Sequence, residues 1–381
     1  MKSHWSLGVF FLMIFSCSTQ PDRLENNNPA LADIPITLKR TDTLQLKLPI
    51  DAVNLENLLF EPQDDFTYLL GNRENNKIQW LDETGEITRE LSIPKEGEFG
   101  LKYPIENLLF LNKDSILVIN RFNTLIMDNQ GVMKSRYELR EQETYGSYRG
   151  IHLASGFPAM FLENTLYYPS SLFGHEQDSK LIFKYKLPGN KAELVFDFPE
   201  NYKKGYWVGD NYSRFFTCPR PDIKSIIISF PWDNHLYQYH IDGQFEQIIA
   251  SPSDIPVINP PANSFEDRKA KGLLQVRKEI FTQFEFGAIT YDKYRNVYYR
   301  IMEYPLSEAA IDELGSTPFY NARDFQILVY DAQNFDLVGK SERLPRGEFV
   351  KTRQLVKPEG LCIELVQKSE NKIDYQIFTL I

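Results

Sequence analysis

Cysteine and histidine are scarce in this chain, which limits the chemistry that it can carry. Only 3 cysteines and 5 histidines occur among 381 residues. Besides Cys17, the cysteines are Cys218 and Cys362, too few for the disulfide framework of a small secreted domain. These two could pair in an oxidising compartment, but the simpler expectation is two separately buried thiols. The scattered histidines lack the spacing of a zinc site, so no metal or other cofactor is expected.

Short catalytic motifs are missing as well. The sequence contains no G-x-S-x-G elbow, no H-E-x-x-H pair, no C-x-x-C pair, no EF-hand loop and no P-loop. An active site can still be assembled from residues that are distant in sequence. The missing motifs therefore make an enzyme the less favoured class without excluding it.

Basic residues are in the minority. The chain has 42 Lys and Arg against 52 Asp and Glu, which gives a formal net charge of −10. Nucleic acids and anionic membranes attract clustered Lys and Arg. The composition therefore argues against both as binding partners, and an anionic ligand would need a local basic patch.

Long apolar runs are absent except at the N-terminus. Lys2 precedes an apolar stretch of eleven residues, Trp5 to Phe15, and Cys17 follows almost at once. This is the layout of a secretory signal. A spanning helix needs about 20 apolar residues, so a transmembrane anchor is the weaker alternative. The pattern predicts a signal peptide over residues 1–16 and lipid attachment at Cys17.

The residues that follow Cys17 predict the remaining organisation of the chain. Residues 17–33 are rich in Asn, Pro and acidic side chains, which is typical of a flexible tether. Residues 34–381 then form the folded domain. We expect a protein of the cell envelope, anchored by its lipid to the outer membrane, with the folded domain in the periplasm or at the cell surface.

An internal repeat indicates the fold. The segment Glu56–Phe60 recurs letter for letter as Glu106–Phe110, fifty residues later. Each copy leads into three further strand-like runs, and the last turn of each unit ends in glycine, at Gly85 and Gly131. Four short strands in about fifty residues are typical of a β-propeller blade.

Four more hairpin patterns follow, which gives six units in all. The last unit is one strand short, while a strand-like run, Ile36–Leu48, is left over before the first unit. Giving this run to the last unit would close the ring and remove an exposed edge. We therefore predict an all-β, six-bladed β-propeller closed by its N-terminal strand, with short helical insertions on one face. A solenoid or two stacked sandwiches would also produce an internal repeat. Neither explains why the last unit lacks one strand while one strand is left over at the N-terminus.

The lipid-attachment pattern at Cys17, the six units and three recurring Gly-Glu-Phe elements suggest a family. These elements are Gly97–Phe99, Glu285–Gly287 and Gly347–Phe349. In these features the chain resembles the TolB-like six-bladed β-propeller lipoproteins of Bacteroidota, an uncharacterised family. The resemblance covers Cys17 to Ile381 and implies a lipid-anchored propeller. It brings no catalytic residues to this sequence.

Long connections predict where a ligand would bind. Propeller geometry places four of them on one face: residues 140–157, 200–222, 251–284 and 303–324. Long loops on a rigid scaffold commonly carry function. Helices are predicted within Ser264–Phe284 and Ser307–Leu314. The apolar face of the first is expected to contain Leu273, Leu274, Val276, Ile280 and Phe281.

Aromatic and basic residues concentrate in one of these connections, residues 201–216. Aromatic faces beside cations suit sugars, peptides and other amphipathic ligands. The candidate ligand-binding residues are therefore Tyr206, Trp207 and Arg214 here, with Tyr148, Arg149 and His152 on the preceding long connection. The structural alternative is that these aromatic residues form a small core beneath the loop.

A binding module is the leading hypothesis. We expect a monomeric, lipid-anchored envelope protein that binds a small molecule, glycan or peptide through its long-loop face. One alternative is a scaffold that docks another envelope protein, which a large apolar patch on that face would favour. Another is a hydrolase or lyase with a funnel-shaped site, which strongly perturbed acids would favour.

Replacing Cys17 by serine tests the anchor. The variant Cys17→Ser lacks the thiol that would be acylated. It should therefore leave the membrane fraction and fail to incorporate a palmitate analogue. Continued labelling, together with sedimentation of the variant with membranes, would show that Cys17 is not the attachment point.

Overall fold

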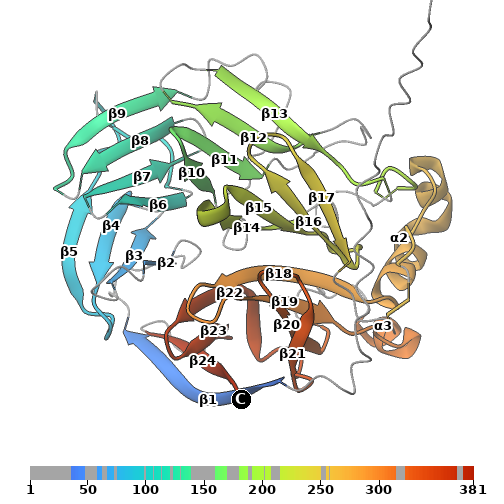
Figure 1. Ribbon diagram of the computed structural model, residues 1–381. Helices are drawn as coiled ribbons and strands as arrows, with labels where there is room; N and C mark the ends of the chain where they lie inside the picture. The colour runs from blue at the N-terminus through green and yellow to red at the C-terminus, as the bar shows by residue number, and fades with distance from the viewer. Residues whose placement is uncertain are drawn as a thin grey trace, which may run out of the picture.

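Antiparallel β-sheets make up most of the regular structure in the computed structural model (Figure 1). The structure describes residues 36–47, 58–61, 67–72, 75–97, 100–105, 107–112, 114–120, 123–128, 130–138, 159–169, 180–187, 191–200, 202–206, 215–249, 255–256, 258–314, 322–366 and 372–381. A short 3-10 helix, Pro221–Ile223, and two α-helices accompany the strands.

Four four-stranded antiparallel sheets come first, each formed by strands that are consecutive in sequence. The first two sheets consist of β2 (Leu58–Glu61), β3 (Thr67–Asn72), β4 (Lys77–Leu81) and β5 (Ile87–Ser92), then β6 (Asn107–Asn112), β7 (Ser115–Ile119), β8 (Asn123–Asp128) and β9 (Met133–Glu138). The next two consist of β10 (Met160–Leu162), β11 (Thr165–Pro169), β12 (Lys180–Lys186) and β13 (Lys191–Asp197), then β14 (Phe216–Arg220), β15 (Ser225–Ser229), β16 (His235–His240) and β17 (Phe245–Ile249). The strands β2 and β6 fall in the two copies of the repeated pentapeptide.

The remaining strands form one eight-stranded sheet. Their order in the sheet is β18 (Glu285–Asp292), β19 (Val297–Glu303), β20 (Phe325–Asp331), β21 (Leu337–Ser341), β1 (Ile36–Lys47), β24 (Lys372–Leu380), β23 (Gly360–Leu365) and β22 (Phe349–Lys357). The N-terminal strand thus lies in the middle of a sheet that otherwise contains the last strands of the chain (Figure 1).

This sheet shows that the prediction of six separate blades is wrong. Strand β1 pairs antiparallel with β24 along most of its length, and its first residues, Ile36–Leu38, pair parallel with β21. Because β1 is hydrogen-bonded on both of its edges, it joins the last seven strands of the chain, β18 to β24, into a single sheet. The fold is propeller-like, with four blades and one eight-stranded sheet.

The eight-stranded sheet curls until its two edge strands, β18 and β22, approach each other. Thr290 Oγ1 on β18 donates a hydrogen bond of 2.6 Å to Gln354 Oε1 on β22. Buried side chains from its strands, including Tyr299, Phe349 and Phe378, fill the space enclosed. The sheet is therefore a nearly closed barrel with a packed interior.

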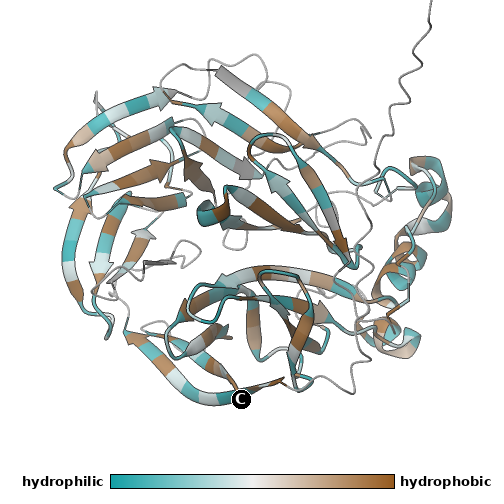
Figure 2. Cartoon of the chain, viewed as in Figure 1, coloured by the Kyte–Doolittle hydropathy of each residue, from teal (hydrophilic) through white to brown (hydrophobic). Residues whose placement is uncertain are grey.

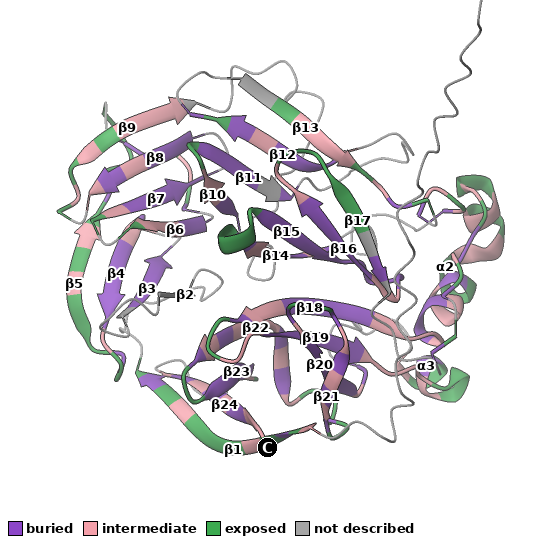
Figure 3. Ribbon diagram, viewed as in Figure 1, coloured by how far each residue is buried: buried purple, intermediate pink, exposed green. Residues whose placement is uncertain are grey.

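The hydrophobic cores lie between neighbouring sheets. The inner strands are buried, whereas the outer strands β5, β9 and β13 are largely exposed or half-buried (Figure 3). Every residue of β15 is buried, and its sequence Ser-Ile-Ile-Ile-Ser is a continuous apolar run between two serines. Such runs are typical of strands covered on both faces. Figure 2 shows the apolar residues concentrated on the same inner strands.

Two junctions between sheets are sealed at a turn glycine. Leu91 of β5 covers the β8–β9 turn, where a Cβ on Gly131 would lie 2.4 Å from Leu91 Cδ1. Lys47 of β1 covers the β4–β5 turn, where a Cβ on Gly85 would lie 2.4 Å from the Lys47 carbonyl oxygen. At Gly85 the close atoms are backbone, so a larger residue would clash, and both glycines have a positive φ that favours glycine. Strands β1 and β5 therefore pack directly on the turn of the next sheet.

A buried arginine joins the fourth sheet to the eight-stranded sheet. The Arg300 guanidinium donates to Ser229 Oγ at 2.9 Å and to the carbonyl oxygens of Asp233 and Asn234 at 2.7 and 3.0 Å. Burial would raise the pKa of the Asp233 carboxyl, but hydrogen bonds from His235 and Tyr237 hold that pKa below its usual value. This network fixes the β15–β16 turn against β19.

Both predicted helices are present, as α2 (Phe265–Phe281) and α3 (Glu308–Leu314). Val276, Ile280 and Phe281 are buried as expected. Leu273 and Leu274 were expected on the same apolar face, and this part of the prediction is wrong because both are exposed. The backbone of Gly272, with φ of 76° and ψ of 163°, interrupts the helix immediately before them and changes the direction of their side chains.

Several features that proteins often use for chemistry are missing from the described part of the chain. Cys218 and Cys362 are both buried and free, and burial raises the pKa of each thiol to about 12. Among the described residues, no three His, Cys, Asp or Glu side chains are grouped to hold a metal ion. No helix within the described ranges is long and apolar enough to cross a membrane.

Truncating Leu38 tests the role of β1. Leu38 is buried in the barrel interior with Phe349 and Phe378, and replacing such a leucine by alanine typically costs about 2–5 kcal/mol. We expect Leu38→Ala to lower the free energy of unfolding in urea by that amount. The exposed neighbour Lys39 provides the control, since Lys39→Ala should change this free energy by less than about 0.5 kcal/mol. Equal, small effects would mean that β1 does not hold the sheet together.

Candidate ligand-binding groove

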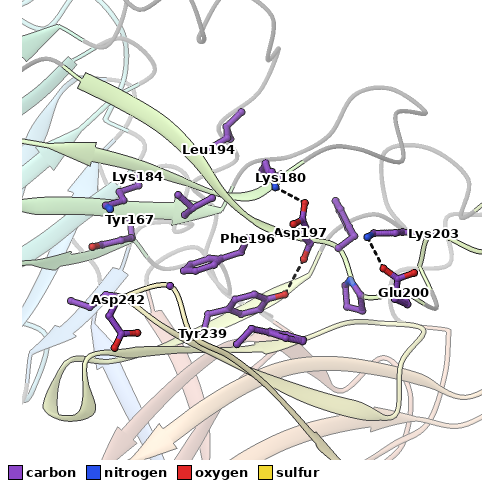
Figure 4. Close-up of a pocket in the computed structure, with 16 residues that line it drawn as sticks. Tyr167, Lys180, Lys184, Leu194, Phe196, Asp197, Glu200, Lys203, Tyr239 and Asp242 are labelled. Atoms are coloured by element: carbon purple, nitrogen blue, oxygen red, sulfur yellow. Dashed lines mark hydrogen bonds and ion pairs between the residues drawn. The ribbon is translucent and has the colours of Figure 1, made fainter. Parts of the chain in front are cut away.

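A groove of about 620 Å³ lies between the third and fourth sheets (Figure 4). One wall comes from β11, β12 and β13, and the other from β16, β17 and the turn between them. One end reaches Phe198 and Lys203, at the start of the long connection from β13 to β14. Small-molecule sites commonly enclose about 300–1,000 Å³, so the groove is large enough for a ligand.

Contacting aromatic rings form the floor of the groove. The ring of Tyr239 contacts those of Phe196 and Phe245, at centroid distances of 4.4 and 4.8 Å. Tyr239 is buried, and its hydroxyl donates a hydrogen bond of 3.0 Å to the carbonyl oxygen of Asp197. Burial raises the pKa of Tyr239, so the hydroxyl keeps its proton. By contrast, the side chain of Phe245 is 50% exposed and can be reached from solvent.

Phe196 has an unusual backbone conformation. Its φ of +65° lies in the left-handed region, which a bulky aromatic residue rarely adopts. Such a conformation costs on the order of 1–3 kcal/mol and persists only where the surroundings hold it. Here the ring packs on Tyr239, and the next residue, Asp197, pairs with Lys180 across β12 and β13. Backbone strain in a cavity wall is often found at functional positions.

The β16–β17 turn, at the junction of the third and fourth sheets, is not covered by neighbouring residues. A Cβ on Gly243, in the β16–β17 turn, would have no heavy atom within 4 Å. The corresponding turn glycines Gly85 and Gly131 are covered by residues of β1 and β5. In the third sheet, the outer strand β13 instead directs Phe196 to Tyr239 and leaves the turn open.

Charged side chains of both signs line the groove. They are Lys180, Lys184 and Lys203 with Asp197, Glu200 and Asp242, so the formal charges cancel. Lys180 lies 2.5 Å from Asp197, and Lys203 lies 2.7 Å from Glu200 (Figure 4). Partly exposed ion pairs contribute only about 0–1 kcal/mol each to stability. These side chains therefore add little to the stability of the fold and can offer hydrogen-bond donors and acceptors to a ligand.

One lysine and one tyrosine of the groove lining face each other. Lys184 stands opposite Tyr167 in the pairing of β11 and β12. A hydrogen bond to Glu193, at 2.9 Å, raises the pKa of Lys184, and burial raises the pKa of Tyr167. Lys184 therefore remains protonated and Tyr167 neutral around pH 7.

Of the ligand-binding residues predicted from the sequence, Tyr206 alone falls within the described residues. Tyr148, Arg149, His152, Trp207 and Arg214 lie outside them, as does Cys17. Tyr206 is buried, its backbone N–H donates to the carbonyl oxygen of Ala262 at 2.7 Å, and its ring is 5.9 Å from that of Phe265. It connects the long connection to the segment around α2 and is not part of the groove lining.

Other described aromatic residues of the same connection are packed in a large hydrophobic core. Tyr202 and Phe215 are buried against Phe230, at centroid distances of 4.7 and 5.6 Å. The Tyr202 hydroxyl also accepts a hydrogen bond of 2.9 Å from the backbone N–H of Trp232. For these residues the structural alternative holds, and their aromatic character serves packing.

One signal for the groove is present in the sequence, in the hairpin of β16 and β17. The Asp242-Gly243 turn sets the hairpin register in which Tyr239 stands opposite Phe245. An aromatic pair across two strands is a recognisable stabilising element. No comparable signal exists for Phe196, because its contact depends on a left-handed backbone and on a neighbouring sheet.

Alanine at position 245 should leave the fold nearly intact. Phe245 is half exposed, so Phe245→Ala should cost less than about 1 kcal/mol. Tyr239→Ala removes a buried ring together with its hydrogen bond and should cost about 3–5 kcal/mol. Urea unfolding of the two variants compares these costs directly. A loss of several kcal/mol in Phe245→Ala would place this ring in the core rather than at the surface of a site.

Solved structures from Bacteroides share the fold. A crystal structure of a DUF4221 family member from Bacteroides vulgatus has a TM-score of 0.74 and 19% sequence identity, over 91% of this chain and 98% of that chain. An exported-protein candidate from Bacteroides fragilis has a TM-score of 0.52 and 11% identity, over 94% of this chain and 98% of the other. At these identities the likeness concerns the fold alone. No curated protein matches the sequence.

The sequence also matches a family model directly. The family is described as "Domain of unknown function (DUF4221)", and the match covers residues 35–342. This range contains β1, the four four-stranded sheets, both α-helices and every residue that lines the groove. The chain therefore belongs to the DUF4221 family.

Proposed function

We propose that this protein is a binding module of the bacterial cell envelope and that the groove takes a neutral saccharide. The proposal depends chiefly on one observation, the exposed ring of Phe245 supported by the buried Tyr239. A binding function also fits a rigid scaffold of packed sheets that carries one open junction.

The aromatic floor favours a ligand with a flat apolar face. One side of a sugar ring presents C–H groups, and these pack on an aromatic ring. Phe245 is reachable from solvent, while the contacts of Tyr239 with Phe196 and Asp197 keep the supporting ring in place. A platform that is already ordered loses little conformational entropy on binding, which favours affinity.

The charged rim favours a neutral ligand with many hydroxyl groups. A hydroxyl both donates and accepts hydrogen bonds. Ammonium donors and carboxylate acceptors alternate along the groove, as in the pairs Lys180–Asp197 and Lys203–Glu200. An anionic ligand would meet the carboxylates, and a cationic ligand would meet the lysines. A neutral polyol uses both kinds of group without charge repulsion.

The proposed location follows from the N-terminal sequence. Acylation of Cys17 would hold the folded domain at the outer membrane, in the periplasm or at the cell surface. Saccharides are abundant in both places as cell-wall material, surface polysaccharide or nutrient. The identity of the sugar is left to the binding experiment.

A calorimetric titration tests the proposal. The mature chain carrying Cys17→Ser is titrated with neutral hexasaccharides of glucose, mannose, xylose and N-acetylglucosamine, and with polygalacturonate and chitosan oligomers as charged controls. We expect at least one neutral sugar to bind, with an affinity that changes less than about twofold between 50 and 500 mM NaCl, because a neutral ligand forms no ion pairs for salt to screen.

Two variants link the binding to the groove. Phe245→Ala should weaken the affinity about tenfold or more, since removing an aromatic contact at a recognition site often costs about 2 kcal/mol. Ile87→Ala removes an exposed apolar side chain from β5, far along the chain from the groove, and should leave the affinity unchanged. Binding that is equal in both variants would locate the site elsewhere. Binding of the charged polymers alone would contradict the saccharide proposal.

A further inference from the structure

Helix α2 exposes three apolar side chains, Phe265, Leu273 and Leu274, and the two leucines form an apolar elbow at the break in the helix. The break at Gly272 places the two leucines at the start of the second half of the helix, where they are 59% and 53% exposed. Phe265, the first residue of α2, is 42% exposed. Single exposed apolar residues are common on protein surfaces, but two adjacent leucines at a helix break are a feature that calls for a partner.

The elbow is held firmly from beneath. Lys271 Nζ donates to the carbonyl oxygen of Pro261 at 2.9 Å and lies 2.9 Å from Glu279 Oε2, so it connects the two halves of α2 across Gly272. At the far end, the buried Arg323 guanidinium donates to the carbonyl oxygens of Ile280 and Gln283, each at 3.1 Å. The leucines are therefore exposed by a fixed backbone geometry.

We infer that the α2 elbow contacts the surface of a lipid bilayer. A specific protein partner normally covers about 800 Å² on each side. Three apolar side chains on one helix are a small fraction of such an interface. A bilayer needs no matching area, because apolar side chains on an amphipathic helix insert individually below the headgroups.

The charges of α2 agree with this partner. The helix contains Arg268, Lys269, Lys271, Arg277 and Lys278 against Glu266, Asp267 and Glu279, so it is basic within a chain of net charge −10. Cations around an apolar apex suit the phosphates of lipid headgroups. The neighbouring α3 is acidic, and its Asp312 pairs with Lys278 at 2.8 Å. The attraction between α2 and the bilayer therefore comes more from insertion of the apolar elbow than from its charge.

Because the proposed lipid anchor would keep the domain near the membrane, a weak contact between the α2 elbow and the bilayer would be enough to orient it. Cys17 precedes the start of β1 by 19 residues, a length that reaches roughly 65 Å when fully extended. The folded domain of an acylated chain would remain within that distance of the bilayer. A second, shallow contact would then orient the domain, in the way that two membrane signals act together.

A site-specific fluorophore tests the contact without the anchor. In the mature Cys17→Ser chain, Leu274→Cys is labelled with an environment-sensitive dye. Val132→Cys, an exposed apolar position in the β8–β9 turn, is the matched control. Cys218 and Cys362 are buried, so labelling is confined to the introduced thiol. With vesicles of phosphatidylethanolamine and phosphatidylglycerol, we expect a blue shift of the dye at position 274 and none at position 132. An unchanged spectrum at saturating lipid would overturn the inference.

Sedimentation with the same vesicles provides a second readout. The double variant Leu273→Ser, Leu274→Ser should bind vesicles about tenfold more weakly or worse, because two inserting side chains are lost. The control Ile87→Ser should bind like the parent chain. Equal binding by all three chains would contradict the inference. A lipid-free dimer that the double variant abolishes would assign the elbow to a second copy instead. Because every chain here lacks Cys17 and no sugar is present, none of these outcomes bears on saccharide binding.

Discussion

Hydrogen bonding on both edges of β1 is the constraint on which the arrangement of the sheets depends. One edge pairs with β24 and the other with β21, so a single strand joins the two halves of the eight-stranded sheet. Its last residue then reaches the first sheet, where the Lys47 N–H donates to the Thr84 carbonyl oxygen at 3.3 Å. One segment therefore joins the two halves of the eight-stranded sheet, contacts the first sheet and covers strand edges that would otherwise be exposed.

Packing around the ring explains where the groove lies. The turn glycines Gly85 and Gly131 are covered by Lys47 of β1 and Leu91 of β5, and Arg300 clamps the fourth sheet to the eight-stranded sheet. The turn at Gly243 remains open. At this junction Phe196 of β13, with its left-handed backbone, packs its ring on Tyr239. The candidate site is thus a local departure from the packing used elsewhere in the ring.

Much of the local structure could be predicted from the sequence, because each element carries its own signal. The repeated pentapeptide, the strand-like runs and the turns that end in glycine predicted the units of four strands. The merged sheet could not be predicted in this way, since the parallel contact of Ile36–Leu38 with β21 is only three residues long and leaves no periodic pattern. The prediction that Leu273 lies on the buried face of its helix was also wrong. A single non-helical residue, Gly272, changes the phase of the helix there and leaves no periodic pattern either.

The candidate site was harder to predict than the fold. The sequence pattern favoured the aromatic residues of the long connection, but described ones such as Tyr202 are packed in a core. The groove instead uses strand residues from two sheets, and their meeting depends on how the sheets pack. Only the pairing of Tyr239 with Phe245 follows from local hairpin register. The left-handed backbone of Phe196 and the contact of its ring with Tyr239 appear only in three dimensions.

Saturation-transfer NMR tests the central claim, that a neutral sugar stacks on the aromatic floor, most directly. In this measurement, aromatic protons of the protein are irradiated and the transfer of saturation to each proton of the bound sugar is recorded. We expect strong transfer to the C–H protons on one face of a single sugar ring. This transfer should be lost when Phe245 is replaced by leucine, which keeps an apolar side chain but removes the ring. Transfer spread evenly over the oligosaccharide, or the same pattern in the leucine variant, would contradict this claim.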